Sequence, residues 1–299
     1  MKRIICNWKK ILCGLLVVVL AIALLLGWGR TKTIPTEAEV QSSTTEEEGV
    51  FVPILMYHSI LKDTSKSGKY TVTPTTIEND LLYLKEHGYT TIVMADLIHY
   101  VYDDVPLPKK PVMITLDDGY YNNYTYLFPL LQEHQIKAVI SIVGSYSQKF
   151  SEIDEPNPAY AYLTWNDILE MSQSGLVEFQ NHSYDMHHQG NGRKGTKRKW
   201  GESDEEYRKN FENDLQKTQD LLRQYTGSYP TTFTYPYGAS SKGSIDLIKE
   251  MGFLASLSCY EHENIITKDP ECLYFLNRYN RPSGISTEEF MKKAGIAEG

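Results

Sequence analysis

Two adjacent acidic residues are the first candidates for chemistry in this sequence. Asp117 and Asp118 follow an apolar run at residues 111–116, and Gly119 comes directly after them. Two neighbouring carboxylates repel each other unless a cation or a proton relieves the repulsion. The glycine permits a sharp turn at the end of a strand. A solvated surface turn would have the same three residues, so the pair becomes informative only together with other side chains that can bind a cation.

Histidines further along the chain supply that second set. His182 and His187 lie five residues apart across an expected turn, so their imidazoles can meet at one ion while a distant carboxylate supplies a third ligand. Two histidines and one aspartate, with coordination positions left open, are typical of a catalytic divalent metal site. His188 competes with His187 for this role, and spacing alone does not separate the two.

The sequence indicates that strands and helices alternate along the chain, and these elements must position the candidate residues. Short apolar runs alternate with stretches in which apolar residues recur at helical spacing, and this pattern predicts a parallel sheet with helices outside it. A barrel and a doubly wound sheet both fit. The expected strands cover residues 52–57, 111–116, 138–143, 177–180, 232–235 and 253–257, and the expected helices 75–87, 127–134, 164–174 and 204–225.

The residues after each expected strand are the ones to examine, because in parallel α/β folds the chemistry lies at the carboxyl ends of the strands. His58 follows the first strand and the two aspartates follow the second. His182 comes after the fourth strand, and Pro236 and Tyr237 come after the fifth. The sequence therefore predicts that carboxylates and imidazoles share one rim of the sheet.

Composition excludes two classes of protein. The 299 residues include 30 basic and 38 acidic side chains, and six of the basic ones lie in residues 1–32, where there is no acidic residue. The rest of the chain is therefore strongly acidic, which argues against a nucleic-acid partner bound through a basic surface. Apolar residues make up 41% of the chain, enough for a large core, so a disordered protein is excluded as well.

The N-terminal region predicts a membrane anchor. Residues 11–29 are uncharged and apolar, which as a helix is long enough to cross a bilayer, and four positive charges precede them. We expect residues 1–30 to be a basic cytoplasmic stub with an uncleaved transmembrane signal anchor, and residues 31–50 a flexible polar linker. Residues 51–299 would then form one extracellular catalytic domain, or a secreted one if the anchor is cleaved.

Outside the anchor the chain has only two cysteines, Cys259 and Cys272. In an oxidising exterior they could pair, or both could remain unpaired core residues.

The residues described so far carry a resemblance to a known family. Residues 115–119 (TLDDG), 182–187 (HSYDMH) and 235–238 (YPYG), in that order, resemble the first three motifs of the polysaccharide deacetylases, carbohydrate esterase family 4. The five-residue histidine step and residues 55–59 (LMYHS) are more similar to the branch that deacetylates poly-β-1,6-linked N-acetylglucosamine. The resemblance covers about residues 52–280 and implies a distorted (β/α) barrel of about seven strands.

The resemblance also implies roles for individual residues. Asp118, His182 and His187 would bind a divalent metal, most readily Zn²⁺, with Co²⁺, Ni²⁺ or Fe²⁺ as alternatives, and Asp117 would be the general base. Pro236 and Tyr237 would line the substrate groove, with a backbone N–H beside Tyr237 as an oxyanion donor.

Two positions depart from the family pattern. Thr234 stands where many members have an arginine that orients the base, and residues 276–278 (LNR) stand where a leucine–x–histidine motif supplies the general acid. Either Arg278 only stabilises charge while Asp117 returns its own proton, or another group such as His262 or His58 is the acid.

We therefore expect a metal-dependent hydrolase that removes N-acetyl groups from an extracellular polysaccharide containing N-acetylglucosamine. The substrate polymer and the membrane are the partners that the sequence implies; no protein partner can be inferred. The alternatives are a catalytically inactive barrel that only binds glycan, an esterase acting on O-acetyl groups, and a glycosidase using two carboxylates.

Overall fold

The computed structural model describes residues 49–190 and 192–296. The predicted transmembrane anchor and most of the predicted linker lie outside this part of the chain. Within it, none of the helices has the length and apolar character needed to span a bilayer.

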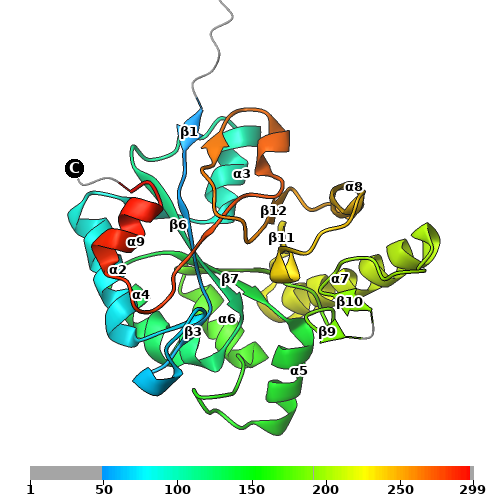
Figure 1. The fold of residues 1–299 in the computed structure, drawn as a ribbon, viewed down its shortest axis with the longest axis horizontal. Helices are drawn as coiled ribbons and strands as arrows, with labels where there is room; N and C mark the ends of the chain where they lie inside the picture. Colours follow the sequence, from blue (N-terminus) through cyan, green and yellow to red (C-terminus); the bar gives the residue numbers. More distant parts are fainter. Residues whose placement is uncertain (1–48, 191, 297–299) are drawn as a thin grey trace, which may run out of the picture. The chain divides into compact units, whose positions relative to one another are not determined.

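The centre of the fold is a curved sheet of eight parallel strands, around which helices pack (Figure 1). Seven of them follow one another in the spatial order β12-β11-β8-β7-β6-β2-β14, and β5 pairs with the first half of β6. The strands are β2 (Ile54–Tyr57), β5 (Thr90–Ile92), β6 (Pro111–Asp118), β7 (Ala138–Ile142), β8 (Val177–Asn181), β11 (Thr232–Thr234), β12 (Ala255–Leu257) and β14 (Tyr279–Asn280).

The two outer strands are joined by the chain just before β14, so the curled sheet closes. Leu276 forms a parallel bridge with Leu257, the last residue of β12. The Ser258 N–H donates to the Leu276 carbonyl, and the Arg278 N–H donates to the Tyr260 carbonyl, each at 2.8 Å. This arrangement fits the predicted distorted (β/α) barrel.

The remaining strands are short and pair outside the main sheet, and helices follow most of the central strands. The short strands are β1 (Val50–Phe51), β3 (Ser59–Ile60), β4 (Thr71–Val72), β9 (Gln189–Gly190), β10 (Arg193–Lys194) and β13 (Ile265–Ile266). The α-helices are α2 (Pro74–Glu86), α3 (Met94–Tyr102), α4 (Phe128–His134), α5 (Gly144–Ile153), α6 (Trp165–Gln173), α7 (Asp204–Thr226), α8 (Ser244–Glu250) and α9 (Thr287–Lys293). Single turns of other helix types lie at Thr64–Lys66, Asn123–Leu127, Pro236–Gly238 and Pro270–Leu273.

The period-two alternation of the strands separates two apolar clusters. Along β6, Val112, Ile114 and Leu116 join the cluster that includes side chains of α2, α4 and α6. The residue between the first two, Met113, packs instead with Ile54, Val139 and Leu257 in a second cluster. Because successive strand side chains point to opposite faces, Thr115 and Asp117 share the face of Met113. Asp117 is thus directed to the same side of the sheet as the second cluster.

The predicted elements are found close to their expected positions, and the long helix begins as the sequence indicates. In α7, Ser203 accepts a hydrogen bond from the Glu206 N–H, and the Glu206 side chain accepts one from the Ser203 N–H, so that a serine and a glutamate three residues apart form a capping box. The helix ends at Gly227, whose φ of +75° is the left-handed conformation that favours glycine.

Candidate metal and catalytic site

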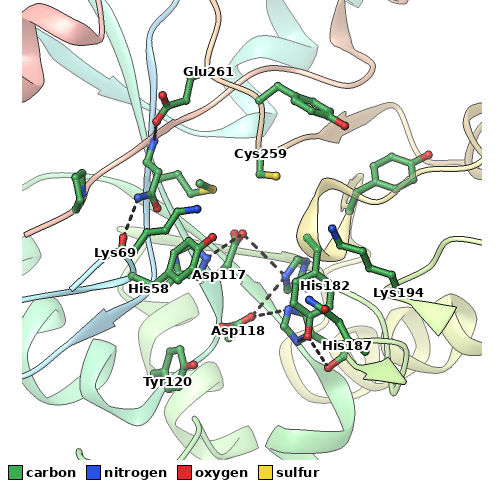
Figure 2. A pocket seen from close by; sticks show the side chains of 18 of the residues that line it. His58, Lys69, Asp117, Asp118, Tyr120, His182, His187, Lys194, Cys259 and Glu261 are labelled. Carbon is green, nitrogen blue, oxygen red and sulfur yellow. Dashed lines mark hydrogen bonds and ion pairs between the residues drawn. The ribbon is translucent and has the colours of Figure 1, made fainter. Parts of the chain in front are cut away.

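The candidate residues meet at the carboxyl ends of two strands, β6 and β8, which β7 separates in the sheet. Asp117 and Asp118 end β6, His182 follows β8 directly, and His187 lies in the loop beyond it. Figure 2 shows the four side chains pointing toward one another. The sheet therefore brings together residues that are up to 70 positions apart in the sequence.

A left-handed turn in the backbone separates the directions of the two aspartates. Asp118 has φ of +74°, which is uncommon for a residue other than glycine, and Gly119 also has φ of +74°. A Cβ at position 119 would lie 2.9 Å from the Cγ2 atom of Ile142, so a side chain there would collide with β7. The turn requires glycine and aims Asp118 at the histidines.

Asp118, His182 and His187 form a compact cluster of possible metal ligands. The Asp118 Oδ1 atom lies 3.1 Å from His187 Nε2 and 3.5 Å from His182 Nε2, and one ligand atom from each residue falls within 4.8 Å of the others. This buried Oδ1 atom accepts no hydrogen bond from the described residues. A buried carboxylate oxygen facing two imidazole nitrogens fits a divalent cation.

The ring of His182 is held in the form that a metal ligand needs. Its Nδ1 atom lies 2.7 Å from the Thr234 carbonyl oxygen, which can only accept, so Nδ1 carries the proton and Nε2 is left with a free lone pair. Burial lowers the pKa of His182 to about 4, against the opposing effect of the nearby Asp117 carboxylate. The imidazole is therefore neutral near pH 7.

The structure distinguishes between the two neighbouring histidines. His187 faces Asp118, and its ring lies against Tyr237 at a centroid distance of 4.6 Å. His188 is exposed, and its Nδ1 donates to the Asp185 carbonyl at 2.8 Å. His187 is thus the residue that can act as the third ligand.

Asp117 has a separate partner. Both of its oxygens accept hydrogen bonds from the Arg278 guanidinium at 2.7 Å, and Arg278 is fully buried. The guanidinium is itself fixed, because its Nε atom donates to the Ser258 carbonyl at 2.6 Å. Burial raises the pKa of Asp117, but the charge and hydrogen bonds of Arg278, together with the nearby His182 and His58, more than offset burial and hold this pKa well below its ordinary value.

The two departures from the family pattern, Thr234 and Arg278, are related: the arginine missing at one position is supplied from the other. Thr234 lacks the guanidinium that was expected at its position, but its carbonyl orients His182. Arg278 occupies the position of the expected histidine and supplies a guanidinium to Asp117. The ion pair was missed because the sequence shows only that the arginine is present, and not that the chain before β14 passes beside the end of β6.

His58 lies on the other side of the acid pair. Its Nε2 atom is 3.9 Å from Asp117 Oδ2, its Nδ1 atom is buried without a hydrogen-bond partner among the described residues, and its ring is tilted on Tyr70 at 4.7 Å. Burial lowers the pKa of His58, although Asp117 opposes the shift. His262, the other candidate acid, is exposed, and its Nδ1 accepts a hydrogen bond from the Glu263 N–H.

Tyr237 and Pro236 are placed differently. Tyr237 has φ of +58°, is 36% exposed and lines the cavity beside His187. Pro236 is buried behind it, where a Cβ at Gly195 would lie 2.6 Å from the Pro236 carbonyl oxygen. Tyr237 thus faces the cavity, and Pro236 packs against the loop that carries β10.

The cavity above these residues has a volume of about 880 Å³ and contains side chains that the sequence did not mark. Cys259 lies on its wall, and Cys259 and Cys272 are both free thiols. Tyr120, which follows the aspartate turn, stacks on Tyr162 at 4.9 Å. Other additions include Lys69, Tyr70, Lys194, Tyr260, Glu261 and Lys293. Lys194 belongs to a stretch with five basic residues at 193–199, a pattern that is typical of a solvated loop.

Two bacterial N-deacetylases are among the known proteins that are similar to this chain in sequence. The poly-β-1,6-N-acetyl-D-glucosamine N-deacetylase of Escherichia coli K12 is 28% identical over 262 residues, which cover 80% of this chain and 38% of that protein. The protein of the same name from Staphylococcus aureus MRSA252 is 25% identical over 194 residues, covering 64% of this chain and 62% of its own. The chain therefore spans less than two thirds of the length of each of these relatives.

Solved structures agree with the fold. A de-N-acetylase from Aggregatibacter actinomycetemcomitans superimposes with a TM-score of 0.68 at 25% identity, covering 81% of this chain and all of that one. IcaB from Ammonifex degensii gives a TM-score of 0.66 at 20% identity, covering 84% and 99% of the two chains. The sequence profile of the family described as polysaccharide deacetylase matches residues 104–256, which include Asp117, Asp118, His182, His187 and Tyr237. The chain therefore belongs to the polysaccharide deacetylase family.

Proposed function

We propose that this protein is a metal-dependent N-deacetylase that acts on an extracellular polymer of N-acetylglucosamine. The observation that carries the proposal is the division between the two adjacent aspartates. Asp118 presents a buried oxygen without a hydrogen bond to two imidazoles, while Asp117 is held apart by Arg278. The names of the E. coli and S. aureus relatives make poly-β-1,6-N-acetylglucosamine the first polymer to test.

Asp118, His182 and His187 would hold the metal ion. The donor set of one carboxylate and two imidazoles suits Zn²⁺, and it also accepts Co²⁺, Ni²⁺ or Fe²⁺. When bound, such an ion polarises an acetamide carbonyl and lowers the pKa of a water molecule toward neutrality. The hydrogen bond from His182 to the Thr234 carbonyl keeps that ligand oriented.

Asp117 acts as the general base. Its ion pair with Arg278 keeps the carboxylate ionised and fixes both oxygens, so that Oδ2 faces the cavity side on which His58 and His182 lie, 3.9 and 4.0 Å away. A base must be within reach of the proton it accepts and in its unprotonated form. Arg278 secures both conditions, and we assign it as the positioning residue of the base.

His58 is the candidate acid for the leaving amine. It lines the cavity, lies next to Asp117 and has a ring nitrogen without a partner among the described residues, whereas His262 does not line the cavity. An amine departs more readily when it receives a proton as the C–N bond breaks. Because burial lowers the pKa of His58, its imidazole starts neutral, so the proton would be the one that Asp117 takes from the water, passed on to His58, whose Nε2 lies 3.9 Å from Asp117 Oδ2. The backbone N–H beside Tyr237 would complete the site as the oxyanion donor.

We also propose that the catalytic domain works outside the cell, held by the apolar segment at residues 11–29. The absence of acidic residues in 1–32 and the excess of positive charge before the segment favour this orientation.

Acetate release from defined substrates tests the proposed activity. The purified protein, stripped of metal and then given Zn²⁺, Co²⁺, Ni²⁺ or Fe²⁺, is incubated with oligomers of β-1,6-linked N-acetylglucosamine and with O-acetylated xylan. Metal-dependent acetate release from the first substrate, with little from the second, is the expected result. Release only from xylan would mean that the protein is an esterase. Binding without release would mean an inactive glycan-binding barrel, and new reducing ends would mean a glycosidase.

A further inference from the structure

The cavity extends beyond the residues that the proposed reaction uses. Its volume of about 880 Å³ lies at the upper end of the range for sites that bind small molecules, so it holds more than the sugar that is being deacetylated. Lys69, Tyr70, Tyr260 and Glu261 line the wall on one side, and Gln189 and Lys194 come from the β9–β10 hairpin. The neighbouring sugars of a polymer would lie against these side chains.

Two tyrosines give this wall an apolar surface. Tyr70 is 48% exposed and contacts His58, and Tyr260 is 58% exposed and packs on Phe275 at a ring distance of 5.8 Å. Exposed aromatic rings with fixed neighbours can accept the flat apolar face of another ring. They can therefore stack against the ring of a sugar in the adjacent position, and the discrimination by charge must come from other side chains.

The charges of the cavity do not cancel. Asp117 is paired with Arg278 and Glu261 with Lys293, each at 2.7 Å, which leaves the Asp118 carboxylate and two further lysines among the charged residues of the cavity. Within residues 49–190 and 192–296, neither Lys69 nor Lys194 forms an ion pair. Figure 2 shows Lys69 beside His58 and Lys194 on the opposite side, near His187, with the acid pair between them.

This positive charge matters because the proposed reaction changes the charge of its substrate. Each deacetylation converts a neutral acetamide sugar into a sugar that carries an ammonium group. Lysines that flank the cavity repel an ammonium group on an adjacent sugar, and partial exclusion of water strengthens the repulsion. The effect is local, since the chain as a whole has a net charge of −8.

We propose that Lys69 and Lys194 make the enzyme read the acetylation state of neighbouring sugars, accepting acetylated neighbours and rejecting those that carry an ammonium group. This inference rests on the proposed N-deacetylase function and adds a specificity to it. The product would be a polymer in which glucosamine residues are spaced apart, because each reaction makes the adjacent sugars poorer substrates.

Two matched oligosaccharides test the inference. One is a fully acetylated pentasaccharide of N-acetylglucosamine, and the other has a single glucosamine next to the central sugar. The assay is run at a pH below the pKa of the glucosamine amine, so that this group is an ammonium. We expect wild-type kcat/KM at the central sugar, from acetate release and mass spectrometry, to be about tenfold higher for the first. Lys69→Gln and Lys194→Gln should each reduce this ratio to roughly threefold, and the double variant should bring it close to one.

Three controls separate charge from shape. Lys69→Arg together with Lys194→Arg should keep the wild-type ratio, and added salt should reduce it. Lys62→Gln removes a lysine that lies seven residues before Lys69 but does not line the cavity. It should leave the ratio of kcat/KM for the two pentasaccharides unchanged. A wild-type ratio near one, or a double variant that keeps the full preference, would overturn the inference.

Calorimetric binding of the two pentasaccharides to the same variants keeps the inference testable without turnover. If no acetate is released but the affinities differ and the difference is lost in the double variant, then the proposed activity is wrong and the charge discrimination stands. If the affinities are equal as well as the rates, the charge discrimination is wrong.

Discussion

Two chemically identical side chains in consecutive positions have different environments here. Asp117 continues the inward alternation of β6 and meets a buried guanidinium, while the left-handed conformation of Asp118 turns the next carboxylate toward two imidazoles. In the proposed mechanism, a base and a metal ligand are thus separated in space although they are adjacent in the sequence. The Asp-Asp-Gly pattern indicates that such a division is possible, but the environment of each carboxylate depends on residues far along the chain.

The division of roles predicts that two matched substitutions both lower activity but differ in their effect on metal content. Asp117→Asn should reduce kcat by about 100-fold or more and leave the metal content unchanged, because only the base is lost. Asp118→Asn should lower metal occupancy as well as activity. Elemental analysis of both variants together with acetate release decides the matter, and equal metal loss in the two would contradict the assignment.

Arg278 should control the protonation of the base. Arg278→Gln removes the charge that holds the pKa of Asp117 down, so the acid limb of the kcat/KM profile should move to higher pH. Because the depressed pKa stabilises the fold above the unfolded pKa of aspartate, that contribution should also be lost at neutral pH.

Arg278→Lys keeps the charge but loses the paired hydrogen bonds, so it should shift the acid limb less while still lowering kcat. A pH–rate profile for each variant, with circular dichroism to confirm folding, makes the comparison. An acid limb that does not move in Arg278→Gln would show that the arginine has only a structural role.

At the scale of elements, some helices and strands are defined by their local sequence pattern and others only by tertiary contacts. The buried strands and α7 were predictable because their apolar runs, periodicity and capping box agree with the final fold. Helix α5 was not predicted: its buried residues are only Gly144, Ser147 and Phe150, which give a weak apolar stripe. Strand β14 has two residues, and only its pairing with β2 defines it. Closure of the barrel, and with it the position of Arg278, therefore could not be derived from the sequence.

A buried ion pair fastens β14 to the helix layer. Asp80 on α2 is fully buried and accepts hydrogen bonds from Tyr57, Thr287 and Arg281. Asp80→Ala would leave the Arg281 charge buried without its partner and should lower the free energy of unfolding by about 3–5 kcal/mol. Asn79→Ala, at the adjacent exposed position, should change it by less than about 0.5 kcal/mol. Urea unfolding followed by circular dichroism measures both values, and similar small effects would mean that the pair does not hold β14.

At the scale of the whole molecule, one edge of the barrel carries the candidate site and the rest of the fold positions it. The proposed metal ligands come from β6 and from the segment after β8, so an ion bound there connects separate parts of the sheet. A ligand that binds only the folded state raises stability, by about 3 kcal/mol when its concentration is roughly a hundred times Kd.

Metal removal should therefore lower the thermal midpoint. We expect added Zn²⁺ to raise the Tm of the metal-free wild type and of Asp117→Asn by similar amounts, and to have little effect on His182→Ala. Differential scanning calorimetry with and without a chelator gives the comparison. A Tm increase that persists in His182→Ala would place the ion elsewhere.

The chain just before β14 both joins the two outer strands and carries the guanidinium that prepares Asp117. During biosynthesis this stretch emerges after nearly all the rest of the domain. A nascent or partly assembled molecule can thus possess both aspartates and both histidines and still lack a correctly prepared base. Hydrolysis would begin only when the final strand docks, so the appearance of activity during refolding would report the last step of assembly.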